Sequence, residues 1–226
     1  MEFGKMARET PVTTQVARHQ PTHVPLDFQI TDVESCVLYD RHGVPVPFQS
    51  LYEEQKCIII FVRHFLCYTC KEYVEDLSKI SQDALRGAGV RMVIIGQSAP
   101  RHIEPFCSLT GSPHEVFVDP ERHIYSRLGL RRGEIFMESA SASPHVKSSM
   151  LMGSLKSMWR AMNSPAFDFQ GDPLQQGGTL IVGPGPEVHF THFDNNRLDH
   201  MPIHWLLQLA GLPPLDLRDH YKVIDI

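Results

Sequence analysis

Residues 56–80 read KCIIIFVRHFLCYTCKEYVEDLSKI, and this stretch decides the fold. Its first part, Lys56–Val62, is a continuous run of mostly β-branched and aromatic residues, which is typical of a strand covered on both faces in a parallel or mixed sheet. From Cys67 to Ile80 the apolar residues recur at helical spacing, with charged residues between them. The stretch therefore predicts a central strand, a short loop and an amphipathic helix that begins near Cys67.

Two cysteines, Cys67 and Cys70, lie at the predicted start of this helix. Unpaired backbone N–H groups and the helix dipole favour an anion there, and Arg63 and His64 precede the pair closely, so a lowered thiol pKa is expected. Residues three apart share a helix face, which brings the two thiols within reach of a disulfide. We predict that Cys67 is the nucleophile, that Cys70 resolves its oxidised form, and that Arg63 and His64 support it.

The Cys67–Cys70 pair allows two other interpretations. A C-x-x-C pair also occurs in zinc sites, but these need a second ligand pair, which Cys36, Cys57 and Cys107 do not supply. Two ordinary buried cysteines would also fit, yet the strand-to-helix position favours a functional role. The 13 histidines show no spacing of a known metal site, so no metal is expected.

Composition narrows the classes of function. The 226 residues contain 21 Lys and Arg against 26 Asp and Glu, and no basic run suggests nucleic-acid binding. The longest apolar run is far shorter than the roughly 20 residues of a membrane-spanning helix. Five cysteines, an odd number, without a signal-like N-terminal segment favour reduced thiols and a cytoplasmic location.

The rest of the chain alternates strands and helices. A hairpin is predicted over 34–48 with its proline-containing return strand at a sheet edge, and further elements follow in βα order. The later elements are a strand at 90–96, a helix at 100–109, a strand at 115–119, a helix at 122–128 opened by Pro120, a β-hairpin at 178–192 and a helix at 203–209.

The predicted domain organisation has three parts. Residues 1–28 are predicted to form a flexible arm, 29–212 an α/β domain, and 213–226 a tail. An insertion at about 131–173 contains a Ser-rich connector and a helix at Met150–Met162, placed before the last β-hairpin. The expected architecture is a thioredoxin-like, peroxiredoxin-like central mixed sheet flanked by helices.

The segment Phe61–Tyr73, with its Cys67-Tyr68-Thr69-Cys70 core, resembles the peroxiredoxin-like 2 family, C-type branch, of the AhpC/TSA antioxidant class. Four further stretches carry the same resemblance, which covers about residues 34–209: Ile95–Ser98, His102–Cys107, Phe167–Pro173 and Gln175–Thr179. The resemblance implies a thioredoxin-like fold and an antioxidant or oxidoreductase activity. A related branch of the family reduces prostaglandin-type endoperoxides through its C-x-x-C pair.

The sequence also departs from typical members. Peroxiredoxins carry P-x-x-x-T-x-x-C, and aligning this pattern on Cys70 puts Arg63 at the proline and Cys67 at the threonine. That alignment would make Cys70 the attacking thiol, whereas the thioredoxin-style interpretation that we adopt gives this role to Cys67. Where thioredoxins have a cis-proline, Gly177-Gly178-Thr179 is expected to approach the substrate with its backbone.

Two functions follow from these observations. The first is a thiol-dependent redox protein that reduces a peroxide, endoperoxide or disulfide through Cys67 and Cys70, with a thioredoxin or glutathione system as external reductant and no bound cofactor. The second is a redox-linked regulatory protein that binds a partner in growth signalling or in metabolic (glycolytic) control. The missing peroxiredoxin proline and threonine and the long insertion favour this alternative.

Overall fold

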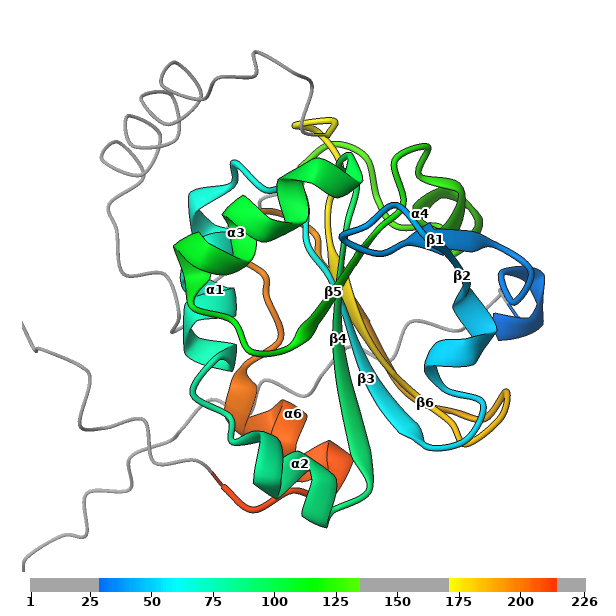
Figure 1. Cartoon of the computed structure of the whole chain (residues 1–226), viewed down its shortest axis with the longest axis vertical. Coiled ribbons are helices and arrows are strands. Elements are labelled where there is room, and N and C mark those ends of the chain that lie inside the picture. Colours follow the sequence, from blue (N-terminus) through cyan, green and yellow to red (C-terminus); the bar gives the residue numbers. More distant parts are fainter. Residues whose placement is uncertain (1–28, 135–170, 215–226) are drawn as a thin grey trace, which may run out of the picture.

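The computed structural model describes residues 29–134 and 171–214, which form one mixed sheet with helices on both faces (Figure 1). The strands are β1 (Val37–Tyr39), β2 (Pro45–Pro47), β3 (Lys56–Phe61), β4 (Val90–Gly96), β5 (Glu115–Val118), β6 (Gly178–Val182) and β7 (Val188–Phe193). The helices are α1 (Tyr68–Leu77), α2 (Gln82–Gly87), α3 (Ile103–Thr110), α4 (His123–Arg127) and α6 (Ile203–Ala210). Three 3₁₀ turns accompany them: η1 (Ile30–Asp32), η2 (Phe48–Leu51) and η3 (Pro100–His102).

The strand order is β2-β1-β5-β4-β3-β6-β7. The three inner strands β3, β4 and β5 run parallel, while β6 pairs antiparallel with β3 and β1 pairs antiparallel with β5. Because both faces of β3 are covered, its sequence is continuously apolar rather than alternating. The predicted thioredoxin-like mixed sheet is confirmed, with β3 inside it and the proline-containing β2 at its edge.

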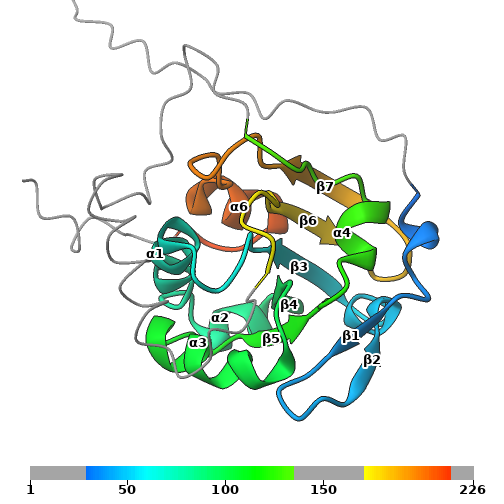
Figure 2. The ribbon, with the colours of Figure 1, turned by 90° about the horizontal axis from the view of Figure 1, so that it is seen from above.

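Side chains alternate between two hydrophobic cores on opposite faces of the sheet. Ile58 and Ile60 of β3 pack on the face covered by α1, α2, α3 and α6, whereas Cys57, Ile59 and Phe61 pack on the face covered by α4, η1 and η2. Figure 2 shows this division, with α4 and α1 on opposite sides of the strands. A one-residue shift of β3 would exchange the two sets, so the register is strongly specified.

The carboxyl ends of β3 and β4 are tied together by a buried tyrosine from α4. The Tyr125 hydroxyl lies 2.8 Å from both the Val62 and the Ile95 carbonyl oxygens and donates to this pair of acceptors. Asp119 fixes α4 in turn, because its carboxylate accepts hydrogen bonds from the backbone N–H groups of His123 and Ile124. This edge of the sheet, from which the C-x-x-C segment emerges, is therefore held rigidly.

Some predicted boundaries were wrong. Pro120 does not open a helix: α4 begins three residues later, after Arg122 adopts a left-handed conformation with φ of 59°. The helix predicted to reach Ile80 ends at Leu77, and α2 was not predicted at all. The arm at 1–28, the helix at Met150–Met162 and most of the tail lie outside the described residues, so those domain boundaries stay predictions.

Candidate active site

Cys67 occupies the N-terminal cap of α1, directly after the loop that leaves β3. Its backbone is extended (φ −68°, ψ 117°), and its Sγ accepts a hydrogen bond from the backbone N–H of Cys70 at 3.4 Å. This is the position of a capping oxygen in an ordinary helix, taken here by sulfur. Both thiols are free and buried: Cys67 is 4% exposed and Cys70 is fully covered.

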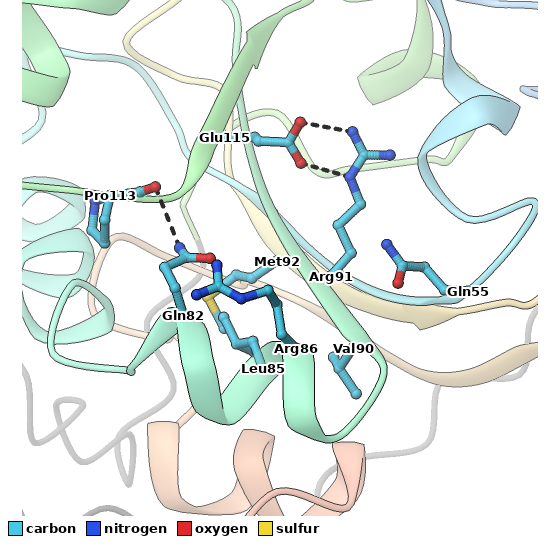
Figure 3. A pocket seen from close by; sticks show the side chains of 9 residues that line it. All are labelled: Gln55, Gln82, Leu85, Arg86, Val90, Arg91, Met92, Pro113 and Glu115. Carbon is cyan, nitrogen blue, oxygen red and sulfur yellow. Dashed lines mark hydrogen bonds and ion pairs between the residues drawn. The ribbon is translucent and has the colours of Figure 1, made fainter.

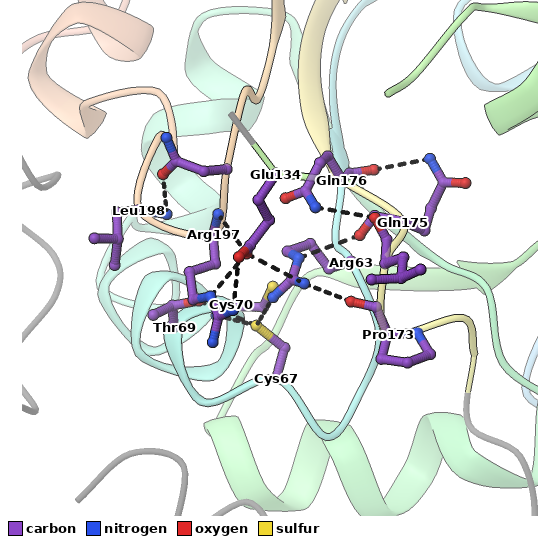
Figure 4. Close-up of polar contacts among 12 residues, drawn as sticks. Arg63, Cys67, Thr69, Cys70, Glu134, Pro173, Gln175, Gln176, Arg197 and Leu198 are labelled. Atoms are coloured by element: carbon purple, nitrogen blue, oxygen red, sulfur yellow. Dashed lines mark hydrogen bonds and ion pairs between the residues drawn. The ribbon is translucent and has the colours of Figure 1, made fainter. Parts of the chain in front are cut away.

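Several groups stabilise the anionic form of Cys67 (Figure 4). The Thr69 hydroxyl lies 3.0 Å from the Cys67 sulfur, and the Arg63 guanidinium donates to it from Nη1 at 3.6 Å. Burial alone would raise the pKa of the Cys67 thiol. Four effects act in the other direction: a hydrogen bond from the Cys70 thiol, the charges of His64 and Arg63, and the Thr69 hydroxyl. They outweigh burial, so the pKa of Cys67 falls well below its ordinary value.

Cys70 has the opposite character. Burial raises its pKa, the hydrogen bond that it gives to Cys67 and the negative charge of that sulfur raise it further, and the result lies well above the ordinary thiol value. The pKa values of the two thiols are therefore shifted in opposite directions, so Cys67 loses its proton before Cys70 does. This geometry favours Cys67 over Cys70 as the attacking sulfur.

The Arg63 side chain makes polar contacts with four residues of the site. It is 5% exposed, and beside Cys67 it contacts the Gln175 carbonyl through Nε at 3.2 Å and the Pro173 carbonyl through Nη2 at 2.6 Å. Nη2 also lies 3.6 Å from a Glu134 carboxylate oxygen. Four partners fix the planar guanidinium, so the charge beside Cys67 is held in one position rather than free to rotate away.

Glu134 and Arg197 form an outer ion pair next to Arg63. Arg197 donates to both Glu134 oxygens, from Nε at 2.7 Å and from Nη2 at 2.6 Å. The Arg197 bond keeps the Glu134 pKa below its usual value although burial opposes this, so Glu134 is ionised and shares its charge between two arginines. Sequence reasoning missed both residues, since they lie 71 and 134 positions from Arg63.

A buried glutamine holds the segment on which Arg63 rests. Gln97 donates through Nε2 to the carbonyls of Arg63 and of Asp172, the latter at 3.0 Å, and accepts from the Asp172 N–H at 3.0 Å. The Asp172 carboxylate pairs with Arg122 and Arg132 at 2.8 and 2.6 Å. The chain just before β6 is thereby fixed against the loop after β3.

His64 lies in the same loop, and its carbonyl accepts the Cys67 N–H at 3.0 Å. Burial lowers the pKa of its imidazole, although the Cys67 charge acts in the other direction, so the neutral form dominates near neutral pH. The positive charge of His64, like that of Arg63, lowers the Cys67 pKa.

Gly177, Gly178 and Thr179 lie at the start of β6. Gly178 and Thr179 belong to β6, whose backbone pairs with β3 on one side and β7 on the other, and all three residues are buried. The backbone that touches the Arg63 side chain belongs instead to Pro173 and Gln175. The predicted backbone contact of Gly177, Gly178 and Thr179 with substrate stays a prediction.

The opposite edge of the sheet carries a small cavity of about 140 Å³, lined among others by Gln82, Arg91 and Glu115 (Figure 3). Arg91 donates to both Glu115 oxygens, at 2.6 and 2.9 Å. The cavity lies at the amino ends of β4 and β5, whereas Cys67 follows the carboxyl end of β3. It is therefore separate from the cysteine pair.

In the described ranges 29–134 and 171–214, no group of three His, Cys, Asp or Glu side chains is arranged to hold a metal ion. Within the same ranges no helix has the length and apolar character needed to cross a membrane.

Comparison with known proteins agrees with this fold. A family profile described as AhpC/TSA antioxidant enzyme matches residues 76–196. "Peroxiredoxin-like 2C" of Takifugu rubripes is 58% identical over 207 residues, covering 90% of this chain and 92% of that protein. The chain belongs to the peroxiredoxin-like 2C family. The Homo sapiens peroxiredoxin-like 2C protein is 55% identical over 194 residues, covering 86% of this chain and 85% of its own.

The chain is also similar to more distant proteins. The Homo sapiens protein named prostamide/prostaglandin F synthase is 28% identical over 185 residues, covering 80% of this chain and 88% of its own. Peroxidoxin BcpB of Mycobacterium tuberculosis has a similar structure, with a TM-score of 0.51, 10% identity and coverage of 77% of this chain and 88% of that chain. This likeness concerns the peroxiredoxin fold, and family membership supports a thiol-dependent redox role.

Proposed function

We propose that this protein reduces peroxides or endoperoxides through the Cys67–Cys70 pair and is then regenerated by an external thiol. The observation that carries the proposal is the pairing of a stabilised thiolate with a protonated thiol three residues later. The thiolate is the reactive species toward peroxides and disulfides, and a neighbouring thiol is needed to close the intramolecular disulfide.

The proposed chemistry has three steps. With a hydroperoxide, the Cys67 thiolate attacks the terminal oxygen of the O–O bond, which breaks; Cys67 becomes a sulfenic acid and the other oxygen leaves as an alkoxide that takes up a proton. With an endoperoxide, the attacked oxygen keeps its carbon, so Cys67 becomes a sulfenate ester while the other oxygen leaves as an alkoxide and takes up a proton. Cys70 then attacks the Cys67 sulfur and forms the disulfide, releasing water from the sulfenic acid or the alcohol from the sulfenate ester. A thiol reductant of the thioredoxin or glutathione type returns both cysteines to their starting state and is itself oxidised to a disulfide.

Arg63 has a defined part in this proposal. Its guanidinium lies beside the Cys67 sulfur and is fixed by the carbonyls of Pro173 and Gln175. It lowers the energy of the thiolate before attack and provides N–H donors near the place where negative charge develops on the leaving oxygen.

The substrate class rests on the relatives. A protein named prostamide/prostaglandin F synthase shares 28% identity over most of the chain, so endoperoxides join hydroperoxides as candidate substrates. Because Cys67 is only 4% exposed, productive attack requires the groups around it to move apart when substrate enters. A cytoplasmic, reducing compartment suits five free thiols and is part of the proposal.

The test compares the wild-type chain with Cys67→Ser, Cys70→Ser and, as matched control, Cys57→Ser in thiol-dependent turnover of hydrogen peroxide, an alkyl hydroperoxide and an endoperoxide. We expect Cys67→Ser to abolish turnover, Cys70→Ser to accumulate sulfenic acid, which mass spectrometry detects, and the control to keep activity. Wild-type activity that survives in Cys67→Ser would contradict the proposal.

The regulatory alternative is tested with the double variant carrying Cys67→Ser and Cys70→Ser. If cells that depend on this protein are restored by the double variant, the fold acts as a binding module and the redox step is dispensable. If restoration needs both cysteines, the redox function is the one that matters in the cell.

A further inference from the structure

The Glu134 carboxylate lies among cationic donors near Cys67. Its Oε1 accepts from the Arg197 side chain through Nε at 2.7 Å and from the Arg197 backbone N–H at 3.3 Å, and its Oε2 accepts from Arg197 Nη2 at 2.6 Å. Arg63 Nη2 lies 3.6 Å from Oε1. Two guanidinium groups and a backbone N–H directed at one carboxylate are the donors that proteins use to bind carboxylate ligands.

The carboxylate adjoins the reactive sulfur through a single side chain (Figure 4). Arg63 Nη1 lies 3.6 Å from Cys67 Sγ, and Nη2 of the same guanidinium lies 3.6 Å from Glu134 Oε1. Because both nitrogens belong to one small planar group, the sulfur and the carboxylate are held side by side. A ligand carboxylate in the place of Glu134 would therefore bring atoms a few bonds away to Cys67.

The two arginines differ in how firmly they are held. The Arg63 side chain is 6% exposed, and the carbonyls of Pro173 and Gln175 fix it. The side chains of Glu134 and Arg197 are 14% and 32% exposed, so each reaches the surface. Opening the way to Cys67 therefore means parting Glu134 from Arg197, while Arg63 stays in place.

Tyr68 supplies a further donor that has no acceptor in this arrangement. It follows Cys67 directly, it is 6% exposed, and its hydroxyl has no hydrogen-bond partner among the described residues. Burial raises its pKa, so the phenol keeps its proton, and the charges of Arg197, Cys67, Glu72 and Glu134 all act on it. A buried donor without an acceptor costs free energy, and an oxygen of a bound ligand would satisfy it.

The charges around the sulfur favour exchange over addition. Arg63 and Arg197 carry two positive charges, and Glu134 and the Cys67 thiolate carry two negative ones. A further anion in this largely buried place would leave an unbalanced negative charge, which is costly where water is scarce. An incoming carboxylate that displaces Glu134 toward solvent keeps the balance.

We infer that Arg63 and Arg197 form a binding site for a carboxylate group of the substrate, and that Glu134 fills this site in the free chain. The inference deepens the proposed redox function and rests on it. The substrate class is then a peroxide that carries a carboxylate within a few bonds of its O–O group. Cys67 breaks the O–O bond as described above, and the carboxylate only positions the substrate.

The binding site is tested without any peroxide by alkylation of Cys67 in the full chain. Iodoacetate and iodoacetamide have nearly the same size, and both transfer a CH₂ carbon to the thiolate with loss of iodide, but only iodoacetate carries a carboxylate next to that carbon. Mass spectrometry gives the rate at Cys67 for each reagent. The ratio of the two rates cancels differences in access and in thiolate fraction, since both reagents need the same opening and the same thiolate.

In wild type we expect the iodoacetate-to-iodoacetamide ratio at Cys67 to exceed that of N-acetylcysteine amide, a neutral reference thiol, by about 10-fold. Arg197→Gln removes the paired N–H donors and should lower the ratio by about 10-fold, the effect of losing a hydrogen bond to a charged group. Arg91→Gln is the matched control, because Arg91 also donates to both oxygens of a glutamate, Glu115, but at the opposite edge of the sheet. It should leave the ratio unchanged.

Glu134→Ala is the second variant, in case Arg197→Gln fails to fold, and it moves the ratio in the other direction. It removes the carboxylate that competes with the reagent, so the preference for iodoacetate should rise by about 5-fold. A Glu134–Arg197 pair that only stabilises the fold would lose unfolding free energy in this variant without any change in the ratio.

Turnover tests whether the substrate supplies the carboxylate. The measurement compares kcat/KM for a tertiary alkyl hydroperoxide that carries a carboxylate near its O–O group with kcat/KM for its methyl ester. We expect wild type to prefer the carboxylate, and Arg197→Gln to lose this preference through a higher KM for the carboxylate while the ester is little affected. Equal values for the two substrates in wild type would overturn the assigned substrate class.

The outcomes separate the two proposals. A ratio that equals the reference thiol in wild type and is the same in Arg197→Gln and Glu134→Ala overturns the carboxylate site and leaves the redox function standing. A chain that prefers iodoacetate at Cys67 but turns over none of the peroxides overturns the redox function and the substrate class, while the carboxylate site itself is supported.

Discussion

Cys57 and Cys67 lie ten residues apart on the same strand-loop-helix unit, and both are buried. The pKa values of their thiols are nevertheless shifted in opposite directions. Cys57 packs between β3 and the α4 face of the sheet, and burial raises its pKa far above the ordinary value, opposed only weakly by Arg91. Cys67 caps α1, and its pKa is lowered. Burial therefore does not decide thiol reactivity; the donors that point at the sulfur decide it.

Arg63→Gln tests the largest contribution to this difference. Loss of a cation in contact with the sulfur should raise the Cys67 pKa by about 1–3 units. The partly buried Glu134 would also lose one of its two arginines, which should lower the unfolding free energy by about 3 kcal/mol. A pH titration of thiolate absorbance and urea denaturation measure the two effects. An unchanged Cys67 pKa in a folded variant would show that Arg63 only supports the loop.

Gly177→Ala tests whether the site depends on close backbone approach. The new methyl group would overlap the Phe61 carbonyl oxygen and press on the Asp194 carboxyl group. We expect a loss of about 1–3 kcal/mol in unfolding free energy, as for other overpacked interiors. Gly87→Ala is the matched control, because open space surrounds that position. Equal stability of both variants would contradict the described packing.

Thr69→Val tests a smaller contribution. It removes the hydroxyl 3.0 Å from Cys67 with little change of volume, and a single hydrogen bond of about 1 kcal/mol corresponds to a rise of somewhat less than one unit in the Cys67 pKa. The same absorbance titration measures it. A Cys67 pKa that falls in this variant would mean that the hydroxyl accepts from the thiol rather than stabilising the thiolate.

Cys57→Ala should have the smallest effect on the redox site. It removes a thiol that stays protonated, so the Cys67 titration and peroxide turnover are expected to match the wild type, while unfolding free energy falls by about 1 kcal/mol because of the small cavity. Altered turnover in a fully folded Cys57→Ala chain would contradict the separation between the two cysteines.

The sequence was sufficient to predict the sheet. The runs that became β3, β4 and β5 are mostly apolar because both faces of each strand are covered, and such runs leave little ambiguity. In contrast α2 was missed, since this six-residue helix buries only Leu85 and shows no apolar period. Gly111 and Gly129 both adopt positive φ where α3 and α4 end.

The site was predictable only in its local part. Cys67, Cys70 and Arg63 lie within eight residues, and their interaction follows from a strand ending where a helix begins. The carbonyl and carboxylate partners of the Arg63 side chain come from segments more than 70 residues away, and only tertiary packing brings them together.

The central claim is that the fold makes Cys67 a thiolate while Cys57 and Cys70 remain thiols. A pH titration of thiolate ultraviolet absorbance tests this claim most directly, because it needs no reagent to enter the buried site. Wild type is compared with Cys67→Ser. We predict that the difference between them shows one thiolate with a midpoint well below the ordinary thiol pKa of about 8.5. A difference with its midpoint at or above that value would contradict the account.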